Sequence, residues 1–128
     1  MDAAWNDDFH HSATVRLTGH NKAYYSDFLG SPEEFLAVLK RGFIYQGQLS
    51  QWQHNPRGTP TIGFPATAFV NFLQNHDQIA NSGLGERIDR LTSPAKFRAM
   101  TALWLLAPQT PMFFPWIVVT GCSSGAAR

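Results

Sequence analysis

Residues 69–78 read FVNFLQNHDQ, an apolar run that ends abruptly in amide, imidazole and carboxylate side chains. The first part of this stretch is rich in strand-forming residues, and its side chains are apolar nearly throughout. Such a pattern is typical of a strand that is buried on both faces, as in parallel sheets covered by helices. The sequence therefore predicts a buried parallel strand over residues 69–73, with Asn75, His76 and Asp77 at its carboxyl end.

Upstream, residues 31–42 (SPEEFLAVLKRG) carry signals for both ends of a helix. Ser31 can cap the helix, Pro32 suits the first helical position, and Glu34 can complete a capping box. Gly42 can adopt the left-handed conformation that ends a helix. Because the apolar side chains between these signals fall on one stripe, we expect an amphipathic helix here.

Downstream, residues 93–108 (SPAKFRAMTALWLLAP) indicate a longer helix. Ser93 can cap it, Pro94 suits its first position, and Pro108 can stop it. Its second half, residues 102–107, is apolar all round, so we expect that half to be deeply buried.

Three further segments complete the expected topology. Residues 83–91 (GLGERIDRL) are predicted to form a short helix, and residues 110–114 (TPMFF) a second short buried strand. Residues 46–67 contain three Pro and three Gly without a sustained period, so we expect a long loop. The alternation of strands and helices predicts parallel βα units and the α/β fold class.

Composition narrows the possible functions. The 128 residues suit one modest domain, and 44% apolar residues indicate a packed core. The net charge is +1 with Lys and Arg scattered, so we expect no nucleic-acid partner. The longest apolar stretch, around residues 99–107, is shorter than the roughly 20 residues that a membrane-spanning helix needs. The single cysteine, Cys122, cannot form an internal disulfide, and no signal-peptide pattern is seen, so a cytoplasmic protein is expected.

Two polar clusters are candidates for chemistry: residues 5–11 (WNDDFHH) and residues 74–78 (QNHDQ). In a (β/α)8 barrel the active site lies at the carboxyl ends of the strands, so clusters that follow neighbouring strands would face one site. Asp, Asn and His form directional hydrogen bonds to sugar hydroxyls, while aromatic rings stack on pyranose rings. The aromatic candidates are Trp5, Tyr24, Tyr25 and Trp52. This mixture favours a sugar-processing site.

Other interpretations of the same residues stay open. Asp77 can be a carboxylate that caps the turn after a strand, and residues 5–11 can form a solvated turn. The tyrosines and Trp52 can be core residues. Asp and His in two clusters also suit a metal-dependent hydrolase or a metal-binding module, but adjacent Asp-Asp and His-His pairs point apart on a regular element. We assign no metal ligand from the sequence.

The motifs together resemble one enzyme family. WNDDFHH, LTG, YYSDF, SPEEF, FLQNHDQIANSGLGERI and LLAPQTPMFF are similar, in order and spacing, to the malto-oligosyltrehalose trehalohydrolases of the alpha-amylase superfamily. The resemblance runs from about residue 2 to residue 114. It implies a partial (β/α)8 TIM barrel, roughly strands six to eight, in a retaining glycosidase that releases trehalose from malto-oligosyltrehalose and needs no cofactor.

The resemblance also implies roles for individual residues. Asp77 corresponds to the third carboxylate of the family, which binds sugar hydroxyls and stabilises the transition state at the end of the seventh strand. The other residues that it places in substrate binding are Asn75, His76, Gln78, Trp5 and Asp7.

In this family the nucleophile and the general acid precede the WNDDFHH motif, so both are expected to be absent here. We therefore expect residues 1–114 to be the C-terminal part of a catalytic barrel that is inactive alone. Residues 115–128 depart from the family and read as a divergent, possibly frameshifted tail. Two alternatives are another glucan enzyme of the superfamily, such as a branching or debranching enzyme, and a remnant without function. The partner subunit, if any, is not indicated.

Overall fold

The structure is a computed structural model that describes residues 3–80 and 85–114. Its central feature is a parallel sheet of three short strands in the order β1-β4-β5. These strands are β1 (Ala4–Trp5), β4 (Phe69–Asn71) and β5 (Thr110–Pro111). The predicted α/β class with a parallel sheet is confirmed. The predicted boundary after residue 114 and the tail that follows it concern residues 115–128, which lie outside the described residues.

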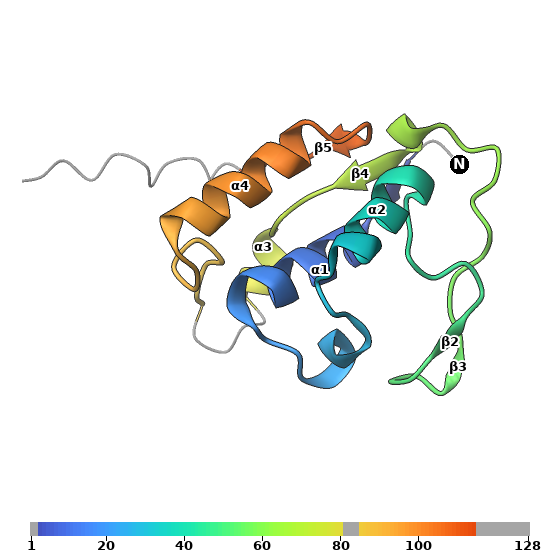
Figure 1. Cartoon of the computed structure of the whole chain (residues 1–128), viewed down its shortest axis with the longest axis horizontal. Helices are drawn as coiled ribbons and strands as arrows, with labels where there is room; N and C mark the ends of the chain where they lie inside the picture. The colour runs from blue at the N-terminus through green and yellow to red at the C-terminus, as the bar shows by residue number, and fades with distance from the viewer. Residues whose placement is uncertain (1–2, 81–84, 115–128) are drawn as a thin grey trace, which may run out of the picture.

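Helices connect the strands (Figure 1). After β1 come α1 (Asp7–Thr18), the 3-10 helix η1 (Ala23–Asp27) and α2 (Pro32–Arg41); after β4 come α3 (His76–Ala80) and α4 (Pro94–Leu105). A short 3-10 helix, η2 (Ala66–Ala68), precedes β4. In Figure 1, α4 runs back antiparallel to β4, as expected where a helix connects two parallel strands.

The helix predicted over residues 31–42 is confirmed, with one difference at its start. The Ser31 hydroxyl accepts a hydrogen bond from the Glu34 backbone N–H at 3.4 Å, and Gly42 has a φ of 84° just past the end. The predicted capping box is not the contact that Glu34 forms. Its carboxylate accepts from the backbone N–H groups of Leu29 and Gly30, both at 2.7 Å, because the preceding turn presents these donors to it.

The second predicted helix is also confirmed, but its burial is not. Helix α4 has Ser93 as cap and Pro94 in its first turn, and it ends before Pro108. In its second half only Trp104 is fully buried, whereas Leu106 just after the helix is 85% exposed. An α-helix buries only the stripe that faces its neighbours, and no layer covers the outer side of α4 among the described residues.

The short helix predicted over residues 83–91 is wrong for the part that the structure describes. Residues 85–87 are irregular and residues 88–92 form a turn or bend. The Gln74 side chain explains this, because its amide donates to the Glu86 carbonyl at 3.4 Å and accepts from the Ile88 N–H at 2.9 Å. It thereby pairs the backbone groups that a helix would have to pair internally.

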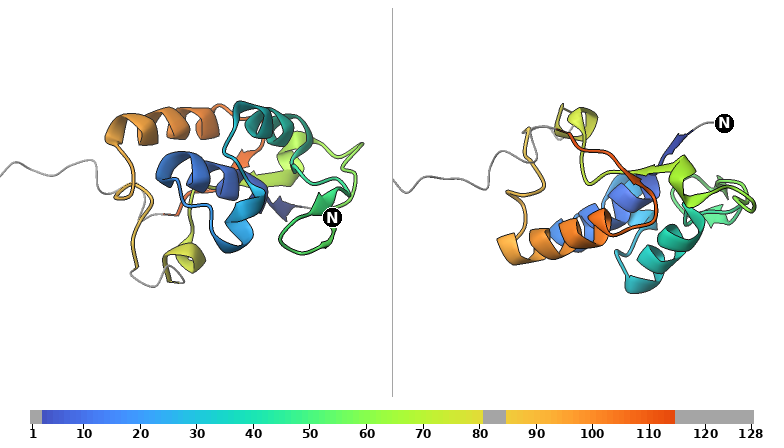
Figure 2. Two further views of the ribbon diagram at one scale, coloured as in Figure 1. Left: turned by 60° about the horizontal axis from the view of Figure 1, so that its bottom comes forward. Right: turned by 90° about the horizontal axis from the view of Figure 1, so that it is seen from above.

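The long loop expected over residues 46–67 contains a small antiparallel hairpin, β2 (Leu49–Ser50) and β3 (Asn55–Pro56). Asp27 fixes it, because its carboxylate accepts hydrogen bonds from the Ser50 hydroxyl and the Trp52 backbone N–H. The side chain of an aspartate far away in the chain therefore supplies order that local composition did not predict. In the views of Figures 1 and 2 the hairpin lies at one end of the molecule, away from α3.

The strand predicted over residues 110–114 is shorter and more exposed than expected. Only Thr110–Pro111 pair with β4, and both are exposed. Strand β5 is at the edge of the described sheet, so one of its sides has no neighbouring strand there.

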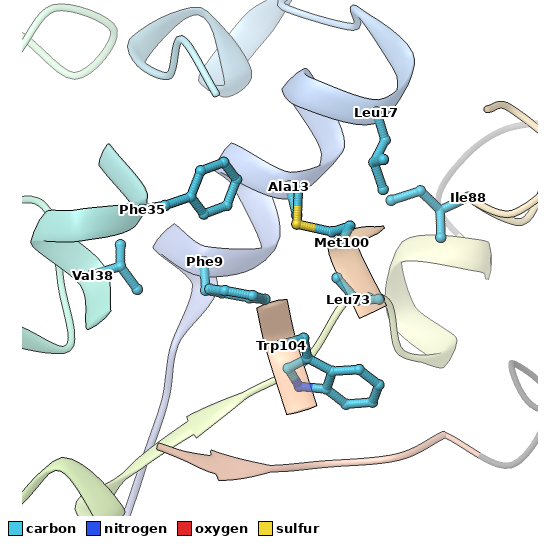
Figure 3. Close-up of a cluster of buried hydrophobic side chains, with 9 residues drawn as sticks. All are labelled: Phe9, Ala13, Leu17, Phe35, Val38, Leu73, Ile88, Met100 and Trp104. Carbon is cyan, nitrogen blue, oxygen red and sulfur yellow. The ribbon is translucent and has the colours of Figure 1, made fainter. Parts of the chain in front are cut away.

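The main core lies where α1, α2 and α4 meet next to β4 (Figure 3). Phe9 and Phe35 meet edge to face at 5.9 Å, and Trp104 reaches β4 by donating its indole N–H to the Asn71 carbonyl at 2.9 Å. The buried members of this core are Phe9, Ala13, Leu17, Phe35, Val38, Leu73, Ile88, Met100 and Trp104. This core fixes the helices against the strand that leads to the polar cluster.

Candidate functional site

The polar cluster after β4 begins a helix instead of standing at the strand end. β4 ends at Asn71, and the chain continues through the buried Phe72 and Leu73 before α3 starts. Asn75 is buried, and its side-chain oxygen accepts a hydrogen bond from the Asp77 N–H at 2.8 Å. Asn75 therefore caps the first turn of α3, a role that Asn commonly has. The predicted contact of Asn75 with substrate is not supported by this arrangement.

His76 and Asp77 occupy the exposed first turn of α3. Their side chains are 66% and 63% exposed, and His76 Nε2 lies 3.1 Å from Asp77 Oδ1. The alternative in which the Asp77 carboxylate caps a turn finds no support, since Asn75 has that role. The carboxylate of Asp77 is thus open to a ligand, with an imidazole beside it.

A cavity of about 640 Å³ adjoins Asp77 and Gln78. Helix α1, the 3-10 helix η1, α3 and the segment that follows α3 enclose it. Its walls combine carboxylates, amides, hydroxyls, one lysine and two tyrosines: His10, Thr14, Thr18, His20, Lys22, Ala23, Tyr24, Tyr25, Gln74, Asp77, Gln78, Glu86, Ile88 and Leu91. The size is within the range of about 300–1,000 Å³ that is usual for ligand pockets.

The cavity brings together only some of the residues predicted from the sequence. Asp77 and Gln78 line it, whereas Trp5, Asp7, Asn75 and His76 do not. Of the four aromatic candidates, Tyr24 and Tyr25 line it, and Trp52 is at the tip of the β2–β3 hairpin. Trp5 is half-exposed and packs edge to face on Phe72, with ring centroids 5.4 Å apart. Asp7 is exposed in the first turn of α1.

The cluster at residues 5–11 is therefore not a solvated turn. Asp8 is buried, and its carboxylate pairs with the Arg57 guanidinium at 2.9 Å and accepts from the Ile44 N–H at 2.9 Å. Burial raises the pKa of Asp8, while the positive charge of Arg57 acts against this rise. The Arg57 guanidinium also lies over the rings of Phe28 and Tyr45, at 5.4 and 5.0 Å from their centroids. Asp8 thus attaches the long loop to α1.

His10 connects α1 to the segment that carries Asp77. Its Nδ1 lies 2.5 Å from the Leu73 carbonyl, and its Nε2 lies 3.2 Å from the Tyr25 hydroxyl. Because a carbonyl only accepts, the proton is on Nδ1, and Nε2 accepts from Tyr25. Burial lowers the pKa of His10 to about 4, so the ring is neutral at pH 7. His10 therefore positions the backbone just before the polar cluster.

A buried chain of amides joins the three strands. Asn6 Nδ2 donates to Asn71 Oδ1 at 2.7 Å, and Asn71 Nδ2 donates to Gln109 Oε1 at 3.3 Å. Gln109 Nε2 continues to the Val38 and Leu39 carbonyls at 3.2 and 2.8 Å. Sequence reasoning missed this network. The signal was Asn71 itself, since an amide within an apolar strand must find buried partners.

No three His, Cys, Asp or Glu side chains in residues 3–80 and 85–114 are grouped so that they could hold a metal ion. No helix in these ranges is both long enough and apolar enough to span a membrane.

Comparison with known proteins agrees with the resemblance seen in the motifs. The chain is 40% identical to a malto-oligosyltrehalose trehalohydrolase of Saccharolobus solfataricus over 114 residues, which is 89% of this chain and 20% of that protein. It is 38% identical to the enzyme of the same name from Deinococcus radiodurans over 116 residues, 89% of this chain and 19% of that protein. The chain thus spans about a fifth of the length of these curated relatives. No protein-family model matches the sequence.

A solved structure shows the same relationship. A crystal structure of a protein described as an alpha amylase from Salmonella typhimurium superposes with a TM-score of 0.79 at 44% sequence identity. The match covers 85% of this chain and 19% of that protein. The resemblance predicted from the motifs is therefore confirmed: over most of its length, this chain is homologous to one segment of malto-oligosyltrehalose trehalohydrolases.

Proposed function

We propose that this chain is a segment of a retaining glycoside hydrolase that cleaves malto-oligosyltrehalose and releases trehalose. The observation that carries the proposal is the exposed Asp77 carboxylate beside a cavity with mixed polar and aromatic walls. The cavity adjoins the segment that follows a parallel strand, and the curated relatives are named trehalohydrolases. Because the chain spans about a fifth of those relatives, the whole activity is assigned by this proposal alone.

We further propose that β1, β4 and β5 are the sixth, seventh and eighth strands of a (β/α)8 barrel, within residues 1–114. Three features support this assignment: the strands are parallel, they are adjacent in chain order, and helix α4 returns along β4. The superposition on a protein described as an alpha amylase adds to it. A barrel of this type carries its active site at the carboxyl ends of the strands, where α3 begins here.

In the proposed reaction Asp77 binds sugar hydroxyls and stabilises the oxocarbenium-like transition state. A fixed carboxylate near a developing positive charge lowers the barrier, because it is already oriented when the charge forms. A retaining glycosidase also needs a nucleophile and an acid/base, two carboxyl groups about 5–5.5 Å apart. By resemblance to the family, other parts of the enzyme supply this pair, so these 128 residues alone are expected to release no trehalose.

A chimera tests the proposed reaction. Residues 3–114 of this chain would replace the matched segment of the Saccharolobus solfataricus trehalohydrolase, and products would be quantified from malto-oligosyltrehalose and from maltohexaose. The proposal predicts trehalose as the main product of the first substrate and slower cleavage of the second. A folded chimera that branches or debranches glucans, or that releases no trehalose, would contradict it.

A further inference from the structure

Tyr24 provides an aromatic face on the wall of the cavity that adjoins Asp77. The side chain lines the cavity and is 46% exposed. It is held from two sides, because its ring lies 4.5 Å from the Tyr25 ring at an interplanar angle of 32° and 5.2 Å from the His11 ring. A surface tyrosine usually changes rotamer freely, whereas this one is packed against two rings and keeps nearly half of its surface available.

The support beneath Tyr24 is itself fixed to the scaffold. Tyr25 is buried and donates its hydroxyl proton to His10 Nε2 at 3.2 Å. Burial raises the pKa of Tyr25, so its hydroxyl keeps the proton that this bond requires. His10 in turn donates from Nδ1 to the Leu73 carbonyl, two residues before Asn75, the cap of α3. One chain of contacts therefore connects the aromatic face to the segment that positions Asp77.

The chemistry of the cavity suits a sugar better than an apolar ligand. A pyranose ring has apolar C–H faces and a rim of hydroxyls, so it needs an aromatic surface together with hydrogen-bond donors and acceptors. The cavity offers Tyr24 for the face, and Lys22, Gln78 and Asp77 for the hydroxyls. Lys22 donates, the carboxylate accepts, and the amide of Gln78 does both.

We propose that Tyr24 is the stacking face of a glucosyl-binding subsite in this cavity, which holds an α-1,4-linked glucose unit of the substrate next to Asp77. The subsite rests on the proposed function, since that function supplies the substrate class. It goes further by assigning binding to η1, a segment that none of the site residues inferred by family resemblance occupies. Tyr25 and His10 are positioning residues for this face.

The test is calorimetric titration of the full 128-residue chain with maltohexaose. Wild-type protein should bind it saturably, and Tyr24→Ala should weaken binding about three- to tenfold, the range expected from the loss of roughly 0.5–1.5 kcal/mol of ring stacking. Tyr24→Phe retains the ring and should keep the wild-type affinity. Phe64→Ala is the matched control, because Phe64 is 48% exposed and does not line the cavity. Its affinity should equal that of the wild type.

A second measurement does not depend on any variant. Saturation-transfer NMR should show transfer from aromatic protons of the chain to the pyranose C–H protons of maltohexaose, with loss of this signal in Tyr24→Ala. The proposal is overturned if the wild type shows no saturable binding, if Tyr24→Ala binds as tightly as the wild type, or if Phe64→Ala weakens binding equally. A chimera that still releases trehalose after such a result would place the failure in the subsite alone, whereas an inactive folded chimera would place it in the proposed function.

Discussion

At the scale of single residues, buried polar side chains do most to define this fold. Asn6, Asn71 and Gln109 are all buried, and each has its amide donors and acceptors used within the protein. A buried amide that keeps its partners costs little, but one that loses a partner exposes the full desolvation penalty. Asn71 is the middle member and therefore the most sensitive one.

Replacing Asn71 with Ala tests this network. The change leaves Asn6 Nδ2 and Gln109 Oε1 buried without their partner, each at a cost of roughly 1–3 kcal/mol. We expect the free energy of unfolding, measured by urea denaturation, to fall by several kcal/mol in total, well beyond the effect of the control Asn55→Ala. Asn55 is exposed on the hairpin and bonds only to the nearby Gln53 carbonyl. Equal losses for the two variants would contradict the network.

His10 predicts a specific dependence of stability on pH. Its pKa is lowered from 6.5 to about 4 by burial, so between these values the unfolded chain binds a proton that the folded chain does not. Stability from this residue is therefore complete above pH 6.5 and is lost as the pH falls towards 4, by at most about 1.4 kcal/mol per pH unit. His10→Asn can still donate to the Leu73 carbonyl but does not titrate. Unfolding free energies measured from pH 7 to pH 4 should fall less steeply in this variant, and an unchanged slope would show that His10 is not the source.

At the scale of elements, one ion pair holds the long loop on the helices. Arg57 in this loop joins the Asp8 carboxylate on α1 and lies over two aromatic rings, so one side chain connects three segments. The loop has little regular structure beyond the β2–β3 hairpin, and its remaining order depends on such contacts.

Removing this cation should release the loop. Arg57→Ala leaves Asp8 buried without its partner, which costs roughly 3 kcal/mol in comparable buried pairs. Chymotrypsin should then cleave at Trp52 and Phe64 much faster than in the wild type, as read by mass spectrometry. The matched control is Arg90→Ala, because Arg90 is largely exposed and its contact with Asp89 is 3.8 Å long. Cleavage at the same rate in both variants would argue against the ion pair as the anchor.

The element scale also shows what local sequence could and could not predict. The helices α2 and α4 were predictable because their caps are written within a few residues of their ends, at Ser31 and Ser93. The first turn of α3 was not, because the apolar run before it resembled a strand that extends to the polar cluster. The hairpin depends on Asp27 and the turn at residues 88–91 on Gln74, and both are contacts between segments far apart in the sequence.

At the scale of the whole molecule, the described residues form three parallel strands with helices packed beside them (Figure 1). The parallel sheet and the α/β class could be predicted from the apolar run of β4. The burial of α4 and β5 could not, since it depends on which elements cover them. Within the site, Asp77 and Gln78 line the cavity as the motif suggested, whereas the support of Tyr24 by Tyr25 and His11 was visible only in the structure.

The most direct test of the whole account is the catalytic contribution of Asp77. In the chimera with the Saccharolobus solfataricus enzyme, kcat/KM for trehalose release would be measured for the parent segment, for Asp77→Asn and for Glu33→Gln. Glu33 is exposed in the first turn of α2 and does not line the cavity, so its variant should keep the parent activity. We expect Asp77→Asn to lower kcat/KM by about 10²–10³-fold, the usual effect of removing one electrostatic stabiliser of a transition state. An Asp77→Asn chimera that works as well as Glu33→Gln would contradict the assignment of Asp77 to the active site.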